Sequence, residues 1–167
     1  SKTYYNSFIS RCYYPFKDKS KSKDYFEKIK QIWKDRDIVI IEGRKSRLGI
    51  GNDLFDGVKS IERILVPEEN AFDKYDEIFD ESIKINKDKL ILIAAGPTAT
   101  ILSYDLYKEG YQVLDIGHID IEYEWFLKKA IKKEPVKNKY VCEAGAGKGV
   151  GEIIDINYKN QIIKELI

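Results

Sequence analysis

The chain has 167 residues, a length that suits one domain built around a single hydrophobic core. Its 29 basic residues are balanced by 28 acidic ones, so the overall charge excludes a strongly basic nucleic-acid-binding domain, and we expect no nucleic-acid partner. No apolar run approaches the roughly 20 residues of a transmembrane helix, and no signal peptide is visible. Cys12 and Cys142 form no CxxC pattern, which favours free thiols in a reducing, cytoplasmic compartment.

The first half of the chain predicts two helices and two strands. Apolar residues at helical spacing, preceded by an aspartate cap, predict a helix over residues 25–34. Residues 37–43 hold four consecutive branched apolar residues between Asp and Gly, which is typical of a strand covered on both faces. A second strand is expected at residues 63–66, and a helix capped by Asn70 is expected over residues 71–85.

The second half continues the same alternation. The clearest buried strand is predicted at residues 90–95, followed by a helix that ends near residue 108, a strand at 112–116 and a helix at 123–133. Strands and helices that alternate through short connections predict an α/β fold with a mostly parallel sheet, right-handed crossovers and helices on both faces. We expect residues 1–167 to form one such domain.

The stretch at residues 115–126 carries the densest group of polar side chains with chemical potential. It contains the protein's one histidine and four carboxylates, namely His118, Asp115, Asp120, Glu122 and Glu124. Ligands of open α/β sheets bind beyond the carboxyl ends of the strands, and oxygen ligands there suit Mg²⁺ or Mn²⁺ beside a phosphate. The alternative is that Asp120 and Glu122 only cap the following helix and favour its positive end.

Two glycine-containing turns follow predicted strands. In residues 43–53, Gly49 and Gly51 would place backbone N–H groups around an anion, and Arg47 would add positive charge. This loop matches neither the GxGxxG nor the GxxxxGK[ST] spacing, and a simple tight turn is the alternative. Residues 96–98 join a strand to a helix N-terminus and predict a contact with a diphosphate or ribose, the alternative being strand–helix packing.

The tail contains a third glycine-rich segment. Residues 140–143 are strand-like, and Gly145, Gly147 and Gly149 then resemble the first motif of S-adenosylmethionine-dependent methyltransferases. Only 16 residues follow Gly151, too few for the βα units that such a site needs. We therefore expect a flexible loop before a closing segment at residues 158–167 and rank a methyltransferase below the function considered next.

Four stretches read together resemble one family. They are Val39-Ile40-Ile41-Glu42-Gly43 continuing into Ser46-Arg47-Leu48-Gly49-Ile50-Gly51-Asn52-Asp53-Leu54-Phe55, then Ala71-Phe72-Asp73-Lys74-Tyr75, Gly96-Pro97-Thr98-Ala99, and Asp115-Ile116-Gly117-His118-Ile119-Asp120-Ile121-Glu122-Tyr123-Glu124-Trp125. Together they resemble the glycosyltransferases of the GT-D fold, found largely in bacteria that glycosylate surface proteins or polysaccharides. The resemblance runs over residues 13–158.

This resemblance implies a Rossmann-like sheet, a nucleotide-sugar donor such as UDP-glucose, a glycan or glycoprotein acceptor, and Mn²⁺ or Mg²⁺ bound through an Asp-X-Glu motif. Asp120-Ile121-Glu122 has that form, so these two residues are assigned to the metal. His118 would bond a phosphate or orient a carboxylate, and Asp53 or Glu124 would serve as an acceptor base. The donor side of the site would comprise Glu42, Arg47, Gly49, Gly51, Asn52, Gly96, Pro97 and Thr98.

The chain also departs from the family pattern. Members carry a further region before the part present here, with an Asp-Gly-Glu string that is itself Asp-X-Glu, so the metal motif of the family has a second possible location. Arg44 stands where an acidic residue is more usual. Since the chain begins at Ser1 without methionine, we expect the C-terminal part of a longer domain. The alternative function is then a non-catalytic or incomplete nucleotide-sugar-binding module.

Overall fold

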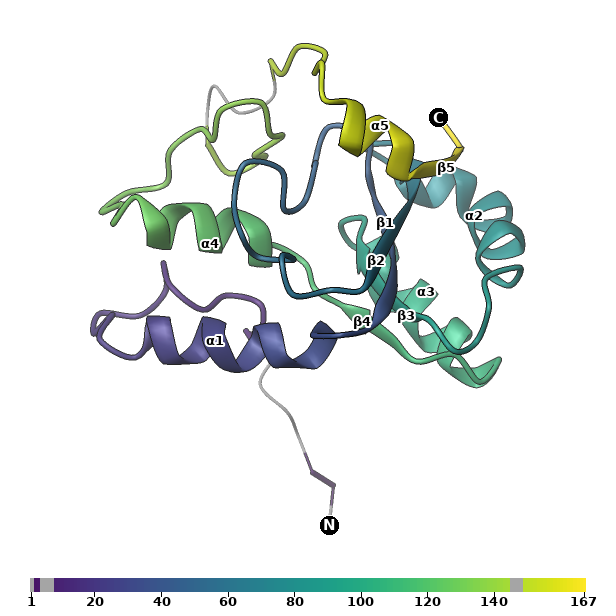
Figure 1. The fold of residues 1–167 in the computed structure, drawn as a ribbon, viewed down its shortest axis with the longest axis horizontal. Helices are drawn as coiled ribbons and strands as arrows, with labels where there is room; N and C mark the ends of the chain where they lie inside the picture. The colour runs from purple at the N-terminus through teal and green to yellow at the C-terminus, as the bar shows by residue number, and fades with distance from the viewer. Residues whose placement is uncertain (1, 4–7, 145–148) are drawn as a thin grey trace.

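A computed structural model describes residues 2–3, 8–144 and 149–167, and its centre is a five-stranded parallel sheet (Figure 1). The strands are β1 (Asp37–Gly43), β2 (Ser60–Val66), β3 (Leu90–Ala94), β4 (Val113–Asp115) and β5 (Ile162–Glu165). Their order in the sheet is β4-β3-β1-β2-β5, and every neighbouring pair is parallel. The carboxyl ends of all the strands therefore lie at one edge.

Helices cover both faces of this sheet, as predicted (Figure 1). α1 (Ser22–Trp33) and α4 (Ile119–Leu127) pack on one face, while α2 (Tyr75–Ser82) and α3 (Thr98–Lys108) pack on the other. The central strand β1 alternates between the two cores, because Ile38 and Ile40 face α1 and α4 whereas Val39 and Ile41 face α2 and α3. This explains its continuous run of branched apolar residues.

Three elements differ from the sequence prediction. The helix expected over residues 71–85 is a short 3₁₀ helix, η1 (Ala71–Lys74), followed by α2, which ends at Ser82, and Asn70 has a left-handed backbone with φ 54° and makes no side-chain cap. Residues 140–143 form no strand. The tail instead supplies α5 (Ile156–Gln161) and the edge strand β5, which the sequence analysis did not anticipate. The predicted glycine loop lies partly outside the described residues, at 145–148.

The difference with the largest consequence is the start of α4. This helix begins at Ile119, four residues before the predicted start at residue 123, and its C-cap is Lys128. Asp120 and Glu122 lie in its first turn, where negative charge is favoured by the helix dipole. The three acidic residues Asp120, Glu122 and Glu124 are therefore helical, and helix geometry decides which of them can meet.

Within the described ranges, no helix is both long enough and apolar enough to cross a lipid bilayer.

Candidate functional site

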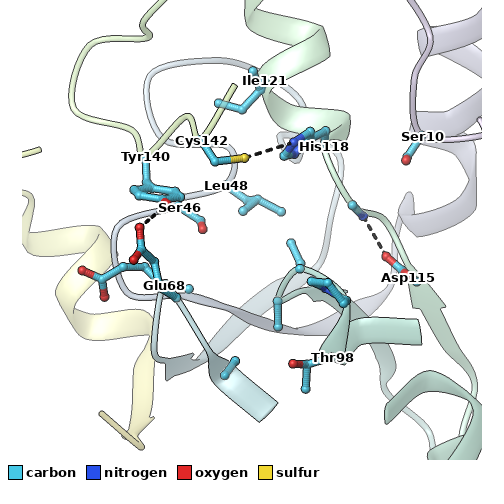
Figure 2. Close-up of a pocket in the computed structure, with 18 of the residues that line it drawn as sticks. Ser10, Ser46, Leu48, Glu68, Thr98, Asp115, His118, Ile121, Tyr140 and Cys142 are labelled. Carbon is cyan, nitrogen blue, oxygen red and sulfur yellow. Dashed lines mark hydrogen bonds between the residues drawn. The ribbon is translucent and has the colours of Figure 1, made fainter. Parts of the chain in front are cut away.

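A pocket of about 870 Å³ opens at the carboxyl edge of the sheet. Its wall includes residues that follow four different strands, Ser46 after β1, Glu68 after β2, Thr98 after β3 and His118 after β4 (Figure 2). Parallel strands bring these loops together, and such crevices are where α/β sheets bind ligands. Pockets that bind small molecules have volumes of about 300–1,000 Å³, so this one has the size of a small-molecule site.

Two helix N-termini border the pocket. Gly96 and Pro97 lead into α3, and Gly117 and His118 lead into α4. Gly96 has a positive φ of 56° in the sharp turn between β3 and α3, a backbone conformation that glycine adopts without strain. The first N–H groups of a helix and its dipole favour an anion, so two sources of positive potential adjoin one cavity.

Asp120 and Glu124 of α4 share their partners. They are four residues apart, so they lie on the same side of the helix. Nζ of Lys139 lies 2.7 Å from Oδ2 of Asp120 and 3.0 Å from Oε1 of Glu124. Nδ2 of Asn52 donates to Oδ1 of Asp120 at 2.9 Å and to Oε1 of Glu124 at 2.8 Å. The backbone N–H of Gly49 also donates to Oδ1 of Asp120, at 2.8 Å.

Glu122 belongs to a different environment. It is two residues from Asp120, so the helix turns its side chain about 200° away. Its fully buried carboxylate accepts from the backbone N–H groups of Tyr13 at 3.0 Å and Tyr14 at 2.7 Å. Burial raises the pKa of Glu122 above its ordinary value, and these two hydrogen bonds oppose that shift. Asp120 lines the pocket, whereas Glu122 fastens the segment before α1 to α4.

The predicted Asp-X-Glu metal pair does not fit this geometry. Asp120 and Glu122 diverge, and both oxygens of Asp120 already face an ammonium group. Among residues 2–3, 8–144 and 149–167, no group of three His, Cys, Asp or Glu side chains is arranged to hold a metal ion. The physical reason is the early start of α4, which converts a loop motif into two opposite faces of a helix.

His118 lies at the pocket wall in a charged cluster. Nε2 of His118 is 3.1 Å from Oε1 of Glu143 and 3.7 Å from Sγ of Cys142, toward which Figure 2 shows its ring directed. Glu143 also pairs with Arg11 and Lys133. The hydrogen bond from Arg11 is the main cause that lowers the pKa of Glu143 to about 2. Burial and the nearby Arg11 lower the pKa of His118, which keeps its ring neutral at pH 7.

In the loop that contains Gly49, the residues predicted to contact the nucleotide-sugar donor lie outside the pocket wall. Gly49 and Gly51 have φ values of 76° and 82°, as expected for a tight turn. Asp53 accepts from the hydroxyl of Tyr123 at 2.6 Å and from Nζ of Lys30 at 2.8 Å. The hydrogen bond from Lys30 is the main reason that the pKa of Asp53 is lowered. Asp53 thus joins α1 to α4.

The two charged residues that flank this loop are buried beside it. Glu42 pairs with Arg63 and accepts from the backbone N–H of Leu48 at 2.7 Å. Arg47 donates to backbone carbonyls of the C-terminal third. Of the predicted residues, the pocket is lined by Gly96, Pro97, Thr98, His118 and Asp120. Outside its wall lie Glu42, Arg47, Gly49, Gly51, Asn52, Asp53, Glu122 and Glu124.

Several lining residues were not anticipated. The segment after β2 contributes Glu68, Asn70 and Phe72, and the parallel strand that ends before Pro67 was a signal for it, because its carboxyl end had to share the edge. Ser10, Arg11, Tyr140 and Cys142 also line the pocket. They belong to no strand or helix, and the strand-like pattern of residues 140–143 did not point to a position at this edge of the sheet.

Tyr140 and Cys142 line one side of the pocket, and the contacts of residues 138–142 hold this segment in place. The backbone N–H of Tyr140 donates to the carbonyl of Lys45 at 2.8 Å, and its hydroxyl donates to Glu69 at 2.7 Å. Nη1 of Arg47 donates to the carbonyl of Asn138 at 2.7 Å. Together with the ion pair between Lys139 and Asp120, these bonds connect residues 138–142 to the loops after β1 and β2 and to α4.

The chain is similar to two proteins named as glycosyltransferases. The chain is 45% identical over 164 residues to glycosyltransferase GlyD of Streptococcus pneumoniae serotype 4, and 45% identical over 163 residues to the probable glycosyl transferase Gly of Streptococcus gordonii. Each match covers 98% of this chain. It covers only 20% of the first relative and 24% of the second, so the chain spans about a fifth to a quarter of their length.

Solved structures give the same picture. A structure described as a new glycosyltransferase (DUF1792) from Streptococcus sanguinis superposes with a TM-score of 0.89 at 45% identity, covering 96% of this chain and 60% of that one. Another, described as the domain of unknown function 1792 with a distinct glycosyltransferase fold, also has a TM-score of 0.89, at 43% identity, and covers 95% and 57%. The family described as glycosyltransferase GT-D fold matches residues 1–144. The chain therefore belongs to the GT-D fold glycosyltransferase family.

Proposed function

We propose that the 870 Å³ pocket binds a nucleotide-sugar donor and that the protein transfers the sugar to a hydroxyl of a glycan or glycoprotein. The observation that carries this proposal is the meeting of four strand-end loops and two helix N-termini around one cavity. UDP-glucose is the donor that we expect, because the family resemblance implies it. The relatives named as glycosyltransferases support the reaction class.

In this reaction the acceptor oxygen bonds to the sugar while the bond from the sugar to the diphosphate breaks. Negative charge grows on the departing diphosphate, so donors fixed in advance around it lower the barrier. The N-termini of α3 and α4 supply such donors, and the hydroxyls of Ser46 and Thr98 line the same space. The pocket therefore suits a leaving group with two phosphates.

A base must accept the proton of the acceptor hydroxyl. Of the candidates, Asp53 is engaged by Lys30 and Tyr123 outside the pocket, and Glu124 is engaged by Lys139. His118 lines the pocket and is kept neutral by its lowered pKa. If its ring donates from Nε2 to Glu143, Nδ1 is left as the proton acceptor. We therefore favour His118 for this role.

The Mn²⁺ or Mg²⁺ ion stays a prediction. Such an ion would neutralise charge on the diphosphate, but the divergent carboxylates of Asp120 and Glu122 do not fit a shared ligand set. In this proposal, the helix N-termini and the hydrogen-bond donors of the pocket stabilise the negative charge on the diphosphate.

A second candidate is a donor-binding module that other residues of a longer enzyme complete. The observation behind it is length, because the chain covers 57–60% of the solved relatives. Donor binding is common to both candidates, whereas release of UDP from UDP-glucose by this chain alone would distinguish the enzyme from the module.

Thermal unfolding with nucleotide sugars tests the pocket. At about 100 times its Kd, UDP-glucose should raise the melting temperature by about 5–10 °C. Thr98→Val removes a pocket hydroxyl while keeping the side-chain shape, so it should weaken UDP-glucose binding about 2- to 10-fold. Tyr104→Phe changes an exposed residue of the same helix outside the pocket and should bind like the wild type.

Each titration should be repeated with Mn²⁺ and with EDTA, and with Asp120→Asn. Stabilisation that requires Mn²⁺ and disappears in Asp120→Asn would restore Asp120 as a metal ligand. The donor proposal fails if no nucleotide sugar changes the melting temperature, or if Thr98→Val and Tyr104→Phe affect binding equally.

A further inference from the structure

A second pocket of about 350 Å³ lies where the loop after β1 meets the C-terminal segment. It is lined by Arg44, Arg47, Leu65, Glu152, Ile153, Tyr158, Lys159, Ile162 and Glu165. None of these residues lines the larger pocket, so the two cavities are separate sites.

Arg47 brings an unbalanced positive charge to this pocket. Its side chain is buried, with only 2% of the residue exposed. Nη1 donates to the carbonyl of Asn138 and Nη2 to the carbonyl of Gly151, both at 2.7 Å, and neither acceptor carries a full charge. Nε has no hydrogen-bond partner among the described residues. Buried charges are normally paired, so this guanidinium lacks the counter-ion that its burial calls for.

The neighbouring arginine shows the contrast. Arg63 is equally buried, but it pairs with the carboxylate of Glu42 and also donates to Leu48 and Gln161. Its charge is thus balanced inside the protein. Of these two arginines, Arg47 is the one without a carboxylate partner among the described residues.

Tyr158 supplies a second unsatisfied donor. Only 3% of the residue is exposed, and the Arg63 guanidinium lies 4.9 Å from the centre of its ring. Its hydroxyl has no hydrogen-bond partner in the part of the chain that the structure describes. Buried tyrosine hydroxyls usually find a partner. Arg47 and Tyr158 therefore line one cavity with two buried groups that can each donate to an acceptor.

The remaining lining residues complete the character of the pocket. Arg44 and Lys159 add two positive charges and Glu152 and Glu165 add two negative ones, so with Arg47 three cations face two carboxylates. Arg44 pairs with Glu152 at 3.2 Å. Leu65, Ile153 and Ile162 provide an apolar side. The volume exceeds that of a single small ion, and water molecules occupy about 30 Å³ each.

We propose that this second pocket binds an oxyanion, a phosphate or carboxylate group carried on a small organic molecule, through Nε of Arg47 and the hydroxyl of Tyr158. A guanidinium matches the oxygens of either group, and a charge-assisted hydrogen bond is stronger than a neutral one. Arg47 also holds Asn138, two residues before Tyr140, which lines the larger pocket. An occupied second pocket would therefore steady the segment that carries Tyr140.

The test is to titrate inorganic phosphate and, separately, acetate into the protein while recording melting temperature and the NMR signals of the arginine Nε–H groups. We expect saturable binding of at least one anion. The anion that binds with the higher affinity identifies the class of ligand. Tyr158→Phe should weaken that binding about 2- to 10-fold, because it removes one hydroxyl and leaves the ring on Arg63.

The single variant Lys159→Gln should also weaken anion binding, and it should reduce the dependence of that binding on salt concentration. Tyr104→Phe, at an exposed position of α3 outside both pockets, is the control and should bind the anion like the wild type. The proposal is overturned if neither anion binds saturably, which would leave the pocket to water. It is also overturned if Tyr158→Phe binds unchanged, or if Thr98→Val abolishes binding and so moves the anion to the larger pocket.

Discussion

Lys139 bonds to two carboxylates at once and is itself only 2% exposed. Its ammonium group lies between Asp120 and Glu124, in the place where a cation would be expected if the two carboxylates were ligands. The spacing of the acidic residues is visible in the sequence. Their partner Lys139 lies 19 residues after Asp120 and 15 after Glu124, and no pattern within residues 115–126 predicts it. Individual acidic residues could be predicted as important, whereas their partners could not.

The first prediction concerns this ion pair. Lys139→Met keeps much of the side-chain volume but leaves Asp120 and Glu124 without their counter-charge, which should lower the free energy of unfolding by about 3–5 kcal/mol. Urea unfolding measures the loss. Lys132→Met, at an exposed position nearby, should change stability by less than about 0.5 kcal/mol.

Adding Asp120→Asn to Lys139→Met should recover part of the loss, because one uncompensated charge is then gone. A loss below about 1 kcal/mol in the single variant would show that the buried pair is not needed for stability.

The second prediction concerns Glu143, whose folded-state pKa is lowered to about 2, chiefly by its hydrogen bond from Arg11. An unfolded glutamate has a pKa of about 4.3, so this group stabilises the fold fully above that pH. Its contribution is lost as the pH falls from about 4 to 2. Glu143→Gln should therefore unfold with a weaker pH dependence than the wild type in this range.

Urea titrations at pH 5 and pH 3 give the comparison. Parallel loss of stability in the two proteins would contradict the assignment. Glu27→Gln, at an exposed position of α1, should behave like the wild type.

At the scale of elements, the alternation of strands and helices was predictable because β1 and β3 each contain a short run of apolar residues, which is typical of a strand covered on both faces. The start of α4 was not predictable, because His118 caps it without a side-chain hydrogen bond and Ile119 continues an apolar pattern shared with the strand. β5 was missed because its exposed residues pair with β2 only after the tail has folded back.

The loop after β1 offers a matched pair of substitutions and the third prediction. Gly49 and Gly51 both have a positive φ, but a Cβ on Gly49 would lie 2.5 Å from Cδ2 of Phe55, whereas a Cβ on Gly51 would meet nothing within 4 Å. Gly51→Ala should therefore cost about 1–2 kcal/mol of unfolding free energy from backbone strain alone.

Gly49→Ala should cost at least about 1 kcal/mol more, since the ring of Phe55 must also shift. Chemical unfolding of both variants checks the order. Equal losses would show that Phe55 yields without cost.

On the scale of the whole molecule, the larger pocket gathers residues from Phe8 to Cys142, more than 130 positions apart. The sequence predicted the edge at which they meet, because parallel strands share a direction, and Gly96, Thr98 and His118 line the pocket at that edge. It could not place Ser10, Tyr140 or Cys142, since those residues reach the pocket through tertiary contacts such as the bond from Tyr140 to Lys45.

The strand lengths across the sheet have a further consequence. The central strands β1 and β2 have seven residues each, whereas the outer strands β4 and β5 have three and four. A second chain that tried to extend the sheet would find only a few free backbone groups at either border. The sheet is thus protected from edge-to-edge aggregation by the shortness of its own outermost strands.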